Sequence, residues 1–197
     1  MQPLQVNTIM QEKSAPGMHS EEEKLILAAK ENPSRFSALY ERYYEQILKF
    51  VYQRVVTKED AFDITQQVFL QAMLSLHKYE LRGFPFSSWL YRIAINELNQ
   101  VFRKNEKQRG VNLEEKHLQE IVEEMNVVSD TEKESAVLNA LTTLDEEDFR
   151  LIEMRFFEKR PFKEIGEILN ITEPNTKMRL YRILDKLKPV VQKNINM

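Results

Sequence analysis

Apolar residues recur at helical spacing along two long stretches of the chain, residues 21–107 and residues 135–188. Within both stretches they fall three or four positions apart, which is typical of an α-helix with one buried face. Neither stretch shows the strict alternation of apolar and polar residues that marks a half-buried strand. Glycine, which weakens helices, occurs only 4 times in 197 residues. The pattern predicts an all-α protein with two small helical domains joined by a flexible linker.

Breaks in this periodicity set the expected domain limits. Residues 1–20 are polar and irregular, which predicts a disordered N-terminal segment. Residues 21–107 form the first helical domain. Residues 108–134 are charged and weakly periodic, which indicates an acidic linker with at most one marginal helix. Residues 135–192 form the second helical domain.

Charge is segregated along the chain, although the net charge is only −3. Residues 111–150 hold 12 acidic and 3 basic side chains, whereas residues 92–109 carry a net +3 and residues 177–197 a net +5. The basic segments favour contact with a polyanion. Three roles stay open for the acids: solvating a tether, mimicking nucleic acid, or covering the basic faces of this same chain.

The second domain contains a predicted helix-turn-helix. Residues 162–169 form an amphipathic helix, residues 170–172 a tight turn, and Thr172 is a suitable N-cap for a third helix. On that third helix, one stripe is expected to pack inward (Thr176, Leu180, Ile183, Leu187). A second stripe is polar and basic (Asn175, Arg179, Arg182, Lys186). It fits a helix that reads the major groove, or a solvated charged face on a small bundle.

The helix predicted over residues 88–104 has the only tryptophan of the chain on its polar face. Trp89 shares this face with Arg92, Asn96 and Arg103, whereas Leu90, Ile93, Ala94 and Val101 lie on the apolar side. Amide and guanidinium groups beside an indole ring make a platform for unstacked bases. The alternative is that Trp89 packs beneath the loop at residues 81–87.

The helix predicted over residues 60–76 carries two leucines on its outer side. Its inward stripe is Ala61, Thr65, Val68, Phe69, Ala72 and Leu76, and the opposite side holds Asp63, Gln67, Leu70 and Leu74. Leucines rimmed by polar groups predict a protein-docking surface. The alternative is a helix that is buried on both sides.

Several functional classes lack their sequence signals. The chain has no cysteine and no glycine-rich phosphate loop, and His19, His77 and His117 are isolated from one another. We therefore expect no metal site, no cofactor and no enzymatic activity. The N-terminus lacks a secretory signal and no apolar run reaches about 18 residues, so we expect a cytoplasmic protein without membrane insertion.

Three segments together resemble a known family. They are "EDAFDITQQVFLQAM", "FSSWLYRIAINELNQVFRK" and "LTTLDEEDFRLIEMRFFEKRPFKEIGEILNITEPNTKMRLYRILDKLK". In this order they resemble bacterial RNA polymerase sigma factors of the extracytoplasmic-function (ECF) group. The resemblance implies a non-enzymatic subunit that binds core RNA polymerase and directs promoter recognition, promoter melting and transcription initiation. Its partners would be core polymerase, promoter DNA and, in some members, an anti-sigma factor.

The resemblance also assigns roles to individual residues. The melted −10 strand would contact Phe84, Phe86, Trp89, Arg92, Asn96 and Arg103. The −35 element would contact the recognition helix through Glu173, Asn175, Thr176, Lys177, Arg179, Arg182 and Lys186. Polymerase would contact Asp63, Gln67, Leu70 and Leu74. The alternative function is a stand-alone helix-turn-helix regulator, in which residues 21–107 sense a signal or dimerise.

Overall fold

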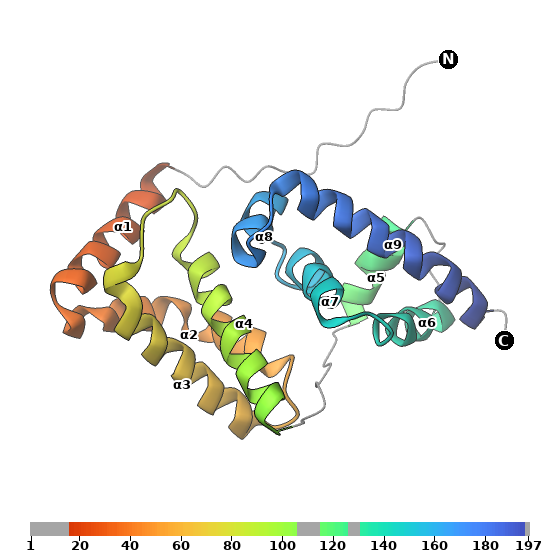
Figure 1. The fold of residues 1–197 in the computed structure, drawn as a ribbon, viewed down its shortest axis with the longest axis horizontal. Coiled ribbons are helices and arrows are strands. Elements are labelled where there is room, and N and C mark those ends of the chain that lie inside the picture. The colour runs from red at the N-terminus through yellow and green to blue at the C-terminus, as the bar shows by residue number, and fades with distance from the viewer. Residues whose placement is uncertain (1–15, 106–114, 126–130, 196–197) are drawn as a thin grey trace, which may run out of the picture.

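The structure is a computed structural model that describes residues 16–105, 115–125 and 131–195. Throughout these ranges the regular elements are helical and no strand occurs (Figure 1). They form two helical domains, and the second contains a helix-turn-helix. The predicted fold class is therefore confirmed.

The first domain packs its longer helices around one apolar core. In chain order its elements are α1 (Pro16–Glu31), η1 (Pro33–Phe36), α2 (Ser37–Tyr52), α3 (Lys58–Ser75), η2 (Leu76–Lys78) and α4 (Phe86–Asn105). Helices α2, α3 and α4 pack against one another, and Ile47, Val68 and Leu90 are fully buried between them. The inward stripe predicted on α3 is buried in full, as its spacing requires.

Local capping explains where the first helices begin. The Asn32 side chain accepts a hydrogen bond from the Ser34 amide (3.0 Å), and the Thr57 hydroxyl accepts one from the Asp60 amide (3.0 Å). Helix α1 begins at Pro16, and proline is well tolerated in a first helical turn. The prediction of an irregular segment is therefore wrong for residues 16–20, and residues 1–15 lie outside the described residues.

The second domain is built around one long helix. Its elements are α5 (Glu115–Glu124), α6 (Thr131–Leu141), α7 (Glu146–Ile152), the π-helical turn η3 (Glu153–Phe157), α8 (Phe162–Leu169) and α9 (Glu173–Ile195). Helix α9 packs against α6, α7 and α8. Helix α5 lies in the segment predicted as a linker, yet it packs on α6 and η3 and buries Leu118, Ile121 and Met125.

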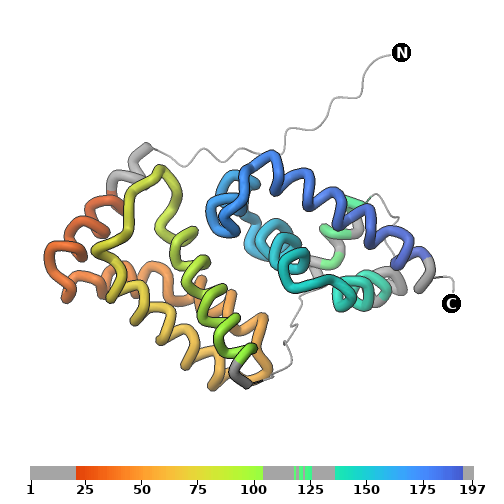
Figure 2. The backbone as a smooth tube through the Cα atoms, viewed as in Figure 1, coloured from red at the N-terminus to blue at the C-terminus, as the bar shows by residue number. Residues whose placement is uncertain are grey.

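The two domains contact each other directly. Helix α4 of the first domain lies beside α8 of the second, in the middle of the molecule (Figures 1 and 2). Helix α4 carries residues that the sequence assigned to the melted strand, and α8 is the first helix of the helix-turn-helix. Their contact therefore bears on both candidate sites.

Candidate nucleic-acid and protein interfaces

The helix-turn-helix is tightened by one residue with left-handed backbone and by one close approach. Helix α8 ends at Asn170, whose φ is 58° and ψ is 43°. The Thr172 hydroxyl accepts a hydrogen bond from the Asn175 amide (3.4 Å). A Cβ atom on Gly166 would lie 2.7 Å from the Ile171 carbonyl oxygen, so the turn needs glycine there. Gly166 was not among the predicted functional residues, although a glycine inside an amphipathic helix is a signal of close packing.

The recognition helix α9 shows the two predicted stripes. Thr176, Leu180, Ile183 and Leu187 are buried, as the periodicity predicted. The assignment of Thr176 to DNA is therefore wrong: it is 0% exposed, and its hydroxyl donates to the Thr172 carbonyl (2.9 Å). Arg179 is half-buried. The other residues assigned to the −35 element are exposed (Glu173, Asn175, Lys177, Arg182, Lys186).

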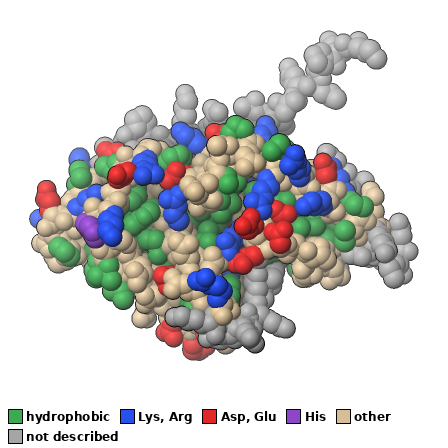
Figure 3. Space-filling view, viewed as in Figure 1, with side chains coloured by type: hydrophobic (Ala, Val, Ile, Leu, Met, Phe, Trp, Pro, Cys, Tyr) green, Lys and Arg blue, Asp and Glu red, His purple; other side chains and the backbone are tan. Residues whose placement is uncertain are grey.

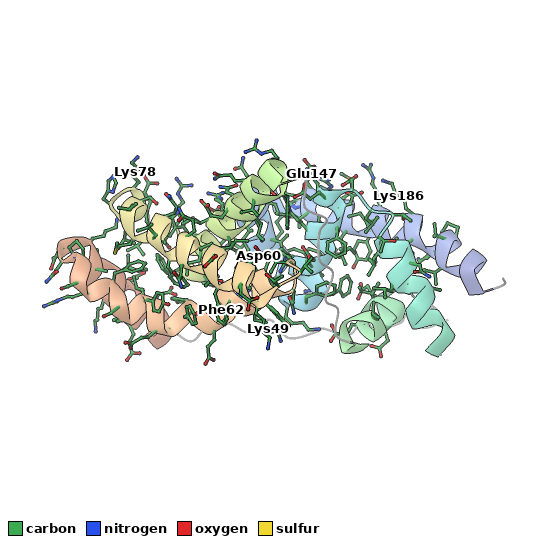
Figure 4. The ribbon with its side chains drawn as sticks, turned by 90° about the horizontal axis from the view of Figure 1, so that it is seen from below. Lys49, Asp60, Phe62, Lys78, Glu147 and Lys186 are labelled. Atoms are coloured by element: carbon green, nitrogen blue, oxygen red, sulfur yellow. The ribbon has the colours of Figure 1, made fainter. Side chains whose placement is uncertain are left out.

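Acidic side chains of α7 form ion pairs with two residues of the basic stripe on α9. Arg179 Nε lies 2.9 Å from Asp148 Oδ1, and its Nη2 lies 2.9 Å from Glu147 Oε2. Lys186 Nζ lies 3.6 Å from Asp148 Oδ2. Figure 3 shows acidic side chains gathered among basic ones, and Figure 4 shows Glu147 and Lys186 on the same side of the molecule. DNA phosphates would have to compete with these carboxylates.

The polar face of α4 borders a pocket of about 150 Å³. Its lining comes from the loop before α4, from α4 itself and from α8 (Lys78, Tyr79, Glu80, Arg82, Phe84, Pro85, Ser88, Trp89, Arg92, Glu167). The Trp89 ring centroid lies 4.9 Å from that of Tyr79 and 5.3 Å from that of Phe86. Trp89 therefore packs on the aromatic core and also lines the pocket, and its role as a platform for bases stays a prediction.

The residues assigned to the melted strand differ in their exposure. Phe86 is 0% exposed and packs among aromatic rings, so its assignment as a strand contact is wrong. The physical reason is that α4 begins at Phe86, which turns this side chain into the core. Phe84, Trp89 and Arg92 are half-buried at the pocket. Asn96 and Arg103 are exposed further along α4.

Helix α1 fixes both ends of the loop that leads into α4. Glu22 is buried, and its carboxylate accepts hydrogen bonds from the Phe86 amide (3.2 Å) and the Tyr43 hydroxyl. Lys30 Nζ donates to the Tyr79 carbonyl (2.5 Å). Burial raises the pKa of Tyr79 to about 12, and the Glu22 charge adds to the shift. The role of Glu22 could not be predicted from the sequence, because Glu22 is one of three consecutive glutamates with no distinguishing signal.

Helix α3 presents an apolar outer surface. Leu70 and Leu74 are 44% and 58% exposed, and Phe62 and Met73 lie on the same helix with similar exposure. Asp63 is exposed beside them and Gln67 is half-buried. Figure 4 shows Phe62 on the outer side of α3. We call Phe62, Asp63, Leu70, Met73 and Leu74 the α3 surface, and the alternative of a helix buried on both sides is wrong.

Two further classes of site have no support in the part of the chain that the structure describes. There, no group of three or more His, Cys, Asp or Glu side chains could hold a metal ion. Among the same residues, no helix combines the length and the apolar character that crossing a membrane requires.

Two protein families match the chain, in the order of its two domains. Sigma-70 region 2 matches residues 39–108, and sigma-70 region 4 matches residues 140–188. Together these matches cover more than half of the chain.

Curated relatives are distant but span most of the sequence. The ECF sigma factor BldN of Streptomyces coelicolor is 25% identical over 156 residues, which are 77% of this chain and 58% of BldN. The ECF sigma factor SigW of Bacillus subtilis is 24% identical over 163 residues, 78% of this chain and 87% of SigW. The B. subtilis ECF sigma factor SigM is 23% identical, covering 80% of this chain and 96% of SigM.

A solved structure shares the fold. CnrH, solved in complex with the cytosolic domain of CnrY, superposes with a TM-score of 0.60 at 18% identity, covering 87% of this chain and 97% of that chain. The chain belongs to the ECF group of the sigma-70 family. Its function is that of a promoter-directing sigma factor, and nothing in these comparisons favours a stand-alone regulator.

Proposed function

We propose that this sigma factor uses three surfaces, each of which binds a different partner during transcription initiation. Helix α9 reads the −35 element, the pocket beside Trp89 takes up a base of the melted −10 strand, and the α3 surface docks on core RNA polymerase. The observation that carries the proposal is that each of the three surfaces has a different chemistry. Basic and amide groups lie on α9, an aromatic pocket lies at α4, and exposed leucines lie on α3.

For the −35 element, the position of each side chain along α9 suggests its role. Asn175 is exposed in the first turn, where recognition helices meet base edges. Its amide can pair with an adenine edge, whereas Lys177, Arg182 and Lys186 supply point charges for phosphates. Arg179 becomes available only when it leaves Glu147 and Asp148.

For the −10 element, the energetics limit what the pocket can do alone. Extruding a base costs a few kcal/mol. Stacking on an aromatic side chain returns about 1–3 kcal/mol per base. Trp89 and Phe84 therefore capture a base that has already left the duplex, with Arg92, Asn96 and Arg103 along the strand. Stable melting requires polymerase to hold the rest of the bubble.

For partner binding, the α3 surface offers apolar area that is already solvent-exposed. Covering Leu70 and Leu74 removes this area from water at no cost to the domain core. We assign it to core polymerase. We also propose a cytoplasmic, non-enzymatic role and an anti-sigma factor as a further partner, since CnrH was solved with the cytosolic domain of CnrY.

Reconstitution with core polymerase tests the proposal. The purified chain should co-elute with core enzyme and direct transcription from a cognate promoter, whereas core enzyme alone should not. A stand-alone regulator would instead bind duplex DNA tightly and specifically without polymerase. That second outcome would overturn the assignment of the α3 surface.

A further inference from the structure

The loop at residues 80–85, which lines the pocket beside Trp89, has little structure of its own. Among the described residues, no backbone–backbone hydrogen bond begins or ends at residues 80–84. The loop has one internal ion pair, between Arg82 Nη2 and Glu80 Oε2 (2.8 Å), and both side chains are largely exposed. An exposed ion pair of this kind contributes little stability. The shape of the loop therefore depends on how its two ends are held.

Helix α1 holds both ends of this loop, one through a cation and the other through a carboxylate. Lys30 Nζ donates to the Tyr79 carbonyl oxygen (2.5 Å), just before the loop. Glu22 Oε1 accepts from the Phe86 amide (3.2 Å), just after it. Glu22 and Lys30 are separated by about 12 Å along the axis of the same helix. Because they belong to one regular helix, α1 fixes the distance between the two ends.

The two residues that α1 holds are the aromatic residues on which Trp89 packs. The ring centroids of Tyr79 and Phe86 lie 5.2 Å apart, with an angle of 82° between the ring planes. The Trp89 centroid lies 4.9 Å from that of Tyr79 and 5.3 Å from that of Phe86. Close-packed side chains transmit displacements, because the interior leaves no space in which one ring could shift alone. A shift of the loop ends therefore moves the indole ring that lines the pocket.

The chemistry of Glu22 suits the start of α4. Phe86 is the first residue of α4, so its amide has no acceptor within the helix. A carboxylate satisfies this amide and is also favoured by the positive end of the helix dipole. The same carboxylate accepts from the Tyr43 hydroxyl of α2, and burial raises the pKa of Tyr43, so this hydroxyl stays a donor. Glu22 is buried and joins α1, α2 and α4 at one point.

We propose that Glu22 and Lys30 are positioning residues of the strand site: they place the loop and Trp89 so that an extruded base fits, without touching DNA themselves. Both belong to α1, which precedes the residues that match sigma-70 region 2 (39–108). The proposal rests on the proposed function of the pocket beside Trp89. A purely stabilising role would lower binding at every nucleotide, whereas a positioning role affects the captured base.

Removal of one base at a time tests the proposal. The probe is a labelled single strand with the non-template −10 sequence of a promoter that the holoenzyme transcribes, and each nucleotide in turn is made abasic. Stacking on an aromatic ring changes affinity by about 5- to 150-fold per base. Wild-type holoenzyme should lose about this factor at the captured position. With Glu22→Met, the complete strand should bind more weakly and the ratio of abasic to complete dissociation constants should fall towards one.

Further variants separate positioning from folding. Lys30→Met changes an exposed side chain, so it keeps the fold, and it should lower the same ratio. Glu22→Gln keeps an acceptor oxygen and should restore most of the ratio. Glu21→Met and Lys24→Met make the same changes at exposed positions of α1 and should leave the ratio at the wild-type value. Thermal melting and co-elution with core polymerase check that each variant is folded, and Lys30→Met decides the matter if Glu22→Met is not.

The outcomes distinguish this proposal from the function on which it rests. If no abasic position matters to wild-type holoenzyme, the pocket captures no base, and both the proposed function of the pocket and the positioning role are wrong. If one position matters and folded Glu22→Met and Lys30→Met keep the wild-type ratio, the pocket captures a base that α1 does not position. A ratio lowered equally by Glu21→Met and Lys24→Met would also contradict the positioning role.

Discussion

Arg54 Nη2 lies 3.1 Å from Glu153 Oε2, and the two side chains are only 4% and 3% exposed. Arg54 Nε donates to the same oxygen (3.2 Å). Arg54 follows the last turn of α2, whereas Glu153 begins the π-helical turn η3, so the pair joins the two domains. Burying two ions costs several kcal/mol each, and only close pairing offsets that cost.

Removing one partner of this pair should separate the domains. Glu153→Ala leaves Arg54 without its paired carboxylate, and breaking a buried pair in this way costs about 3–5 kcal/mol. Because the domains can part and hydrate Arg54, we expect opening and not unfolding. Small-angle scattering should show a larger radius of gyration, while circular dichroism should show unchanged helix content.

The double variant Arg54→Met/Glu153→Met is the matched control. It removes both charges and keeps apolar volume in the interface, a change that is often neutral or stabilising for a buried pair. It should stay compact. If Glu153→Ala also stays compact, the pair does not hold the domains together.

Acidification should strengthen the closed form, in which the two domains contact each other, through Glu158. Burial raises the pKa of Glu158, and the Glu153 charge adds to this, while Arg54, Tyr91 and Arg160 oppose it. A raised pKa means that the closed form holds the proton more tightly than the open form. Closure is therefore favoured most below the ordinary glutamate pKa of about 4.3 and weakens as pH rises through the raised value.

Energy transfer between fluorophores on the two domains measures this pH dependence. Its steepest slope is at most about 1.4 kcal/mol per pH unit for one proton. Glu158→Gln should flatten the curve, because glutamine does not titrate. A pH dependence that survives in Glu158→Gln would place the titrating group elsewhere.

Leu70→Gln/Leu74→Gln should abolish binding to core polymerase with little change in stability. Both leucines are exposed, and surface substitutions usually change stability by less than about 0.5 kcal/mol. Co-elution with core enzyme and thermal melting measure the two effects. Leu27→Gln is the control on α1, where a leucine is 51% exposed away from the α3 surface. Retained binding in the double variant would remove α3 from the polymerase interface.

Periodicity predicted what each helix buries against its own domain. The inward stripes of α3 and α9 are correct because helical spacing fixes which side chains share a face. The same reasoning failed at the start of α4, where the helix begins two residues before the predicted start at residue 88 and takes Phe86 into the core. Helix ends depend on local capping, and here on Glu22, which is distant in sequence.

Hydrophobic periodicity could not predict the contacts between the two domains. Arg92 was placed on the polar side of its helix, but polarity alone does not say what covers a face. In the structure Glu167 covers Arg92, and Arg150 covers Asn99 on the same helix. Of the acids suspected of covering basic faces, Glu147 and Asp148 do pair with Arg179.

Asn175 and Lys186 should affect DNA binding in different ways. Asn175→Ala should change base preference at one position, because an amide that pairs with a base edge discriminates by about 1–3 kcal/mol. Lys186→Ala should weaken binding to all sequences and lower the salt slope by about one. Binding of holoenzyme to a set of −35 variants at several salt concentrations measures both. Equal effects on every sequence from both changes would rule out base reading by Asn175.

Gly166→Ala sets two physical effects against each other. Alanine is the better helix former by about 1 kcal/mol, so propensity alone predicts a more stable α8. The added Cβ would lie 2.7 Å from the Ile171 carbonyl oxygen and 3.4 Å from the Glu173 amide nitrogen, and both are backbone atoms that cannot rotate away. The turn must therefore open, and overpacking of this kind costs about 1–3 kcal/mol. We expect a net loss of stability in chemical denaturation and weaker −35 binding, with polymerase binding through α3 unchanged. A variant at least as stable as the wild type would show that α8 and α9 do not approach as closely as the structure has them.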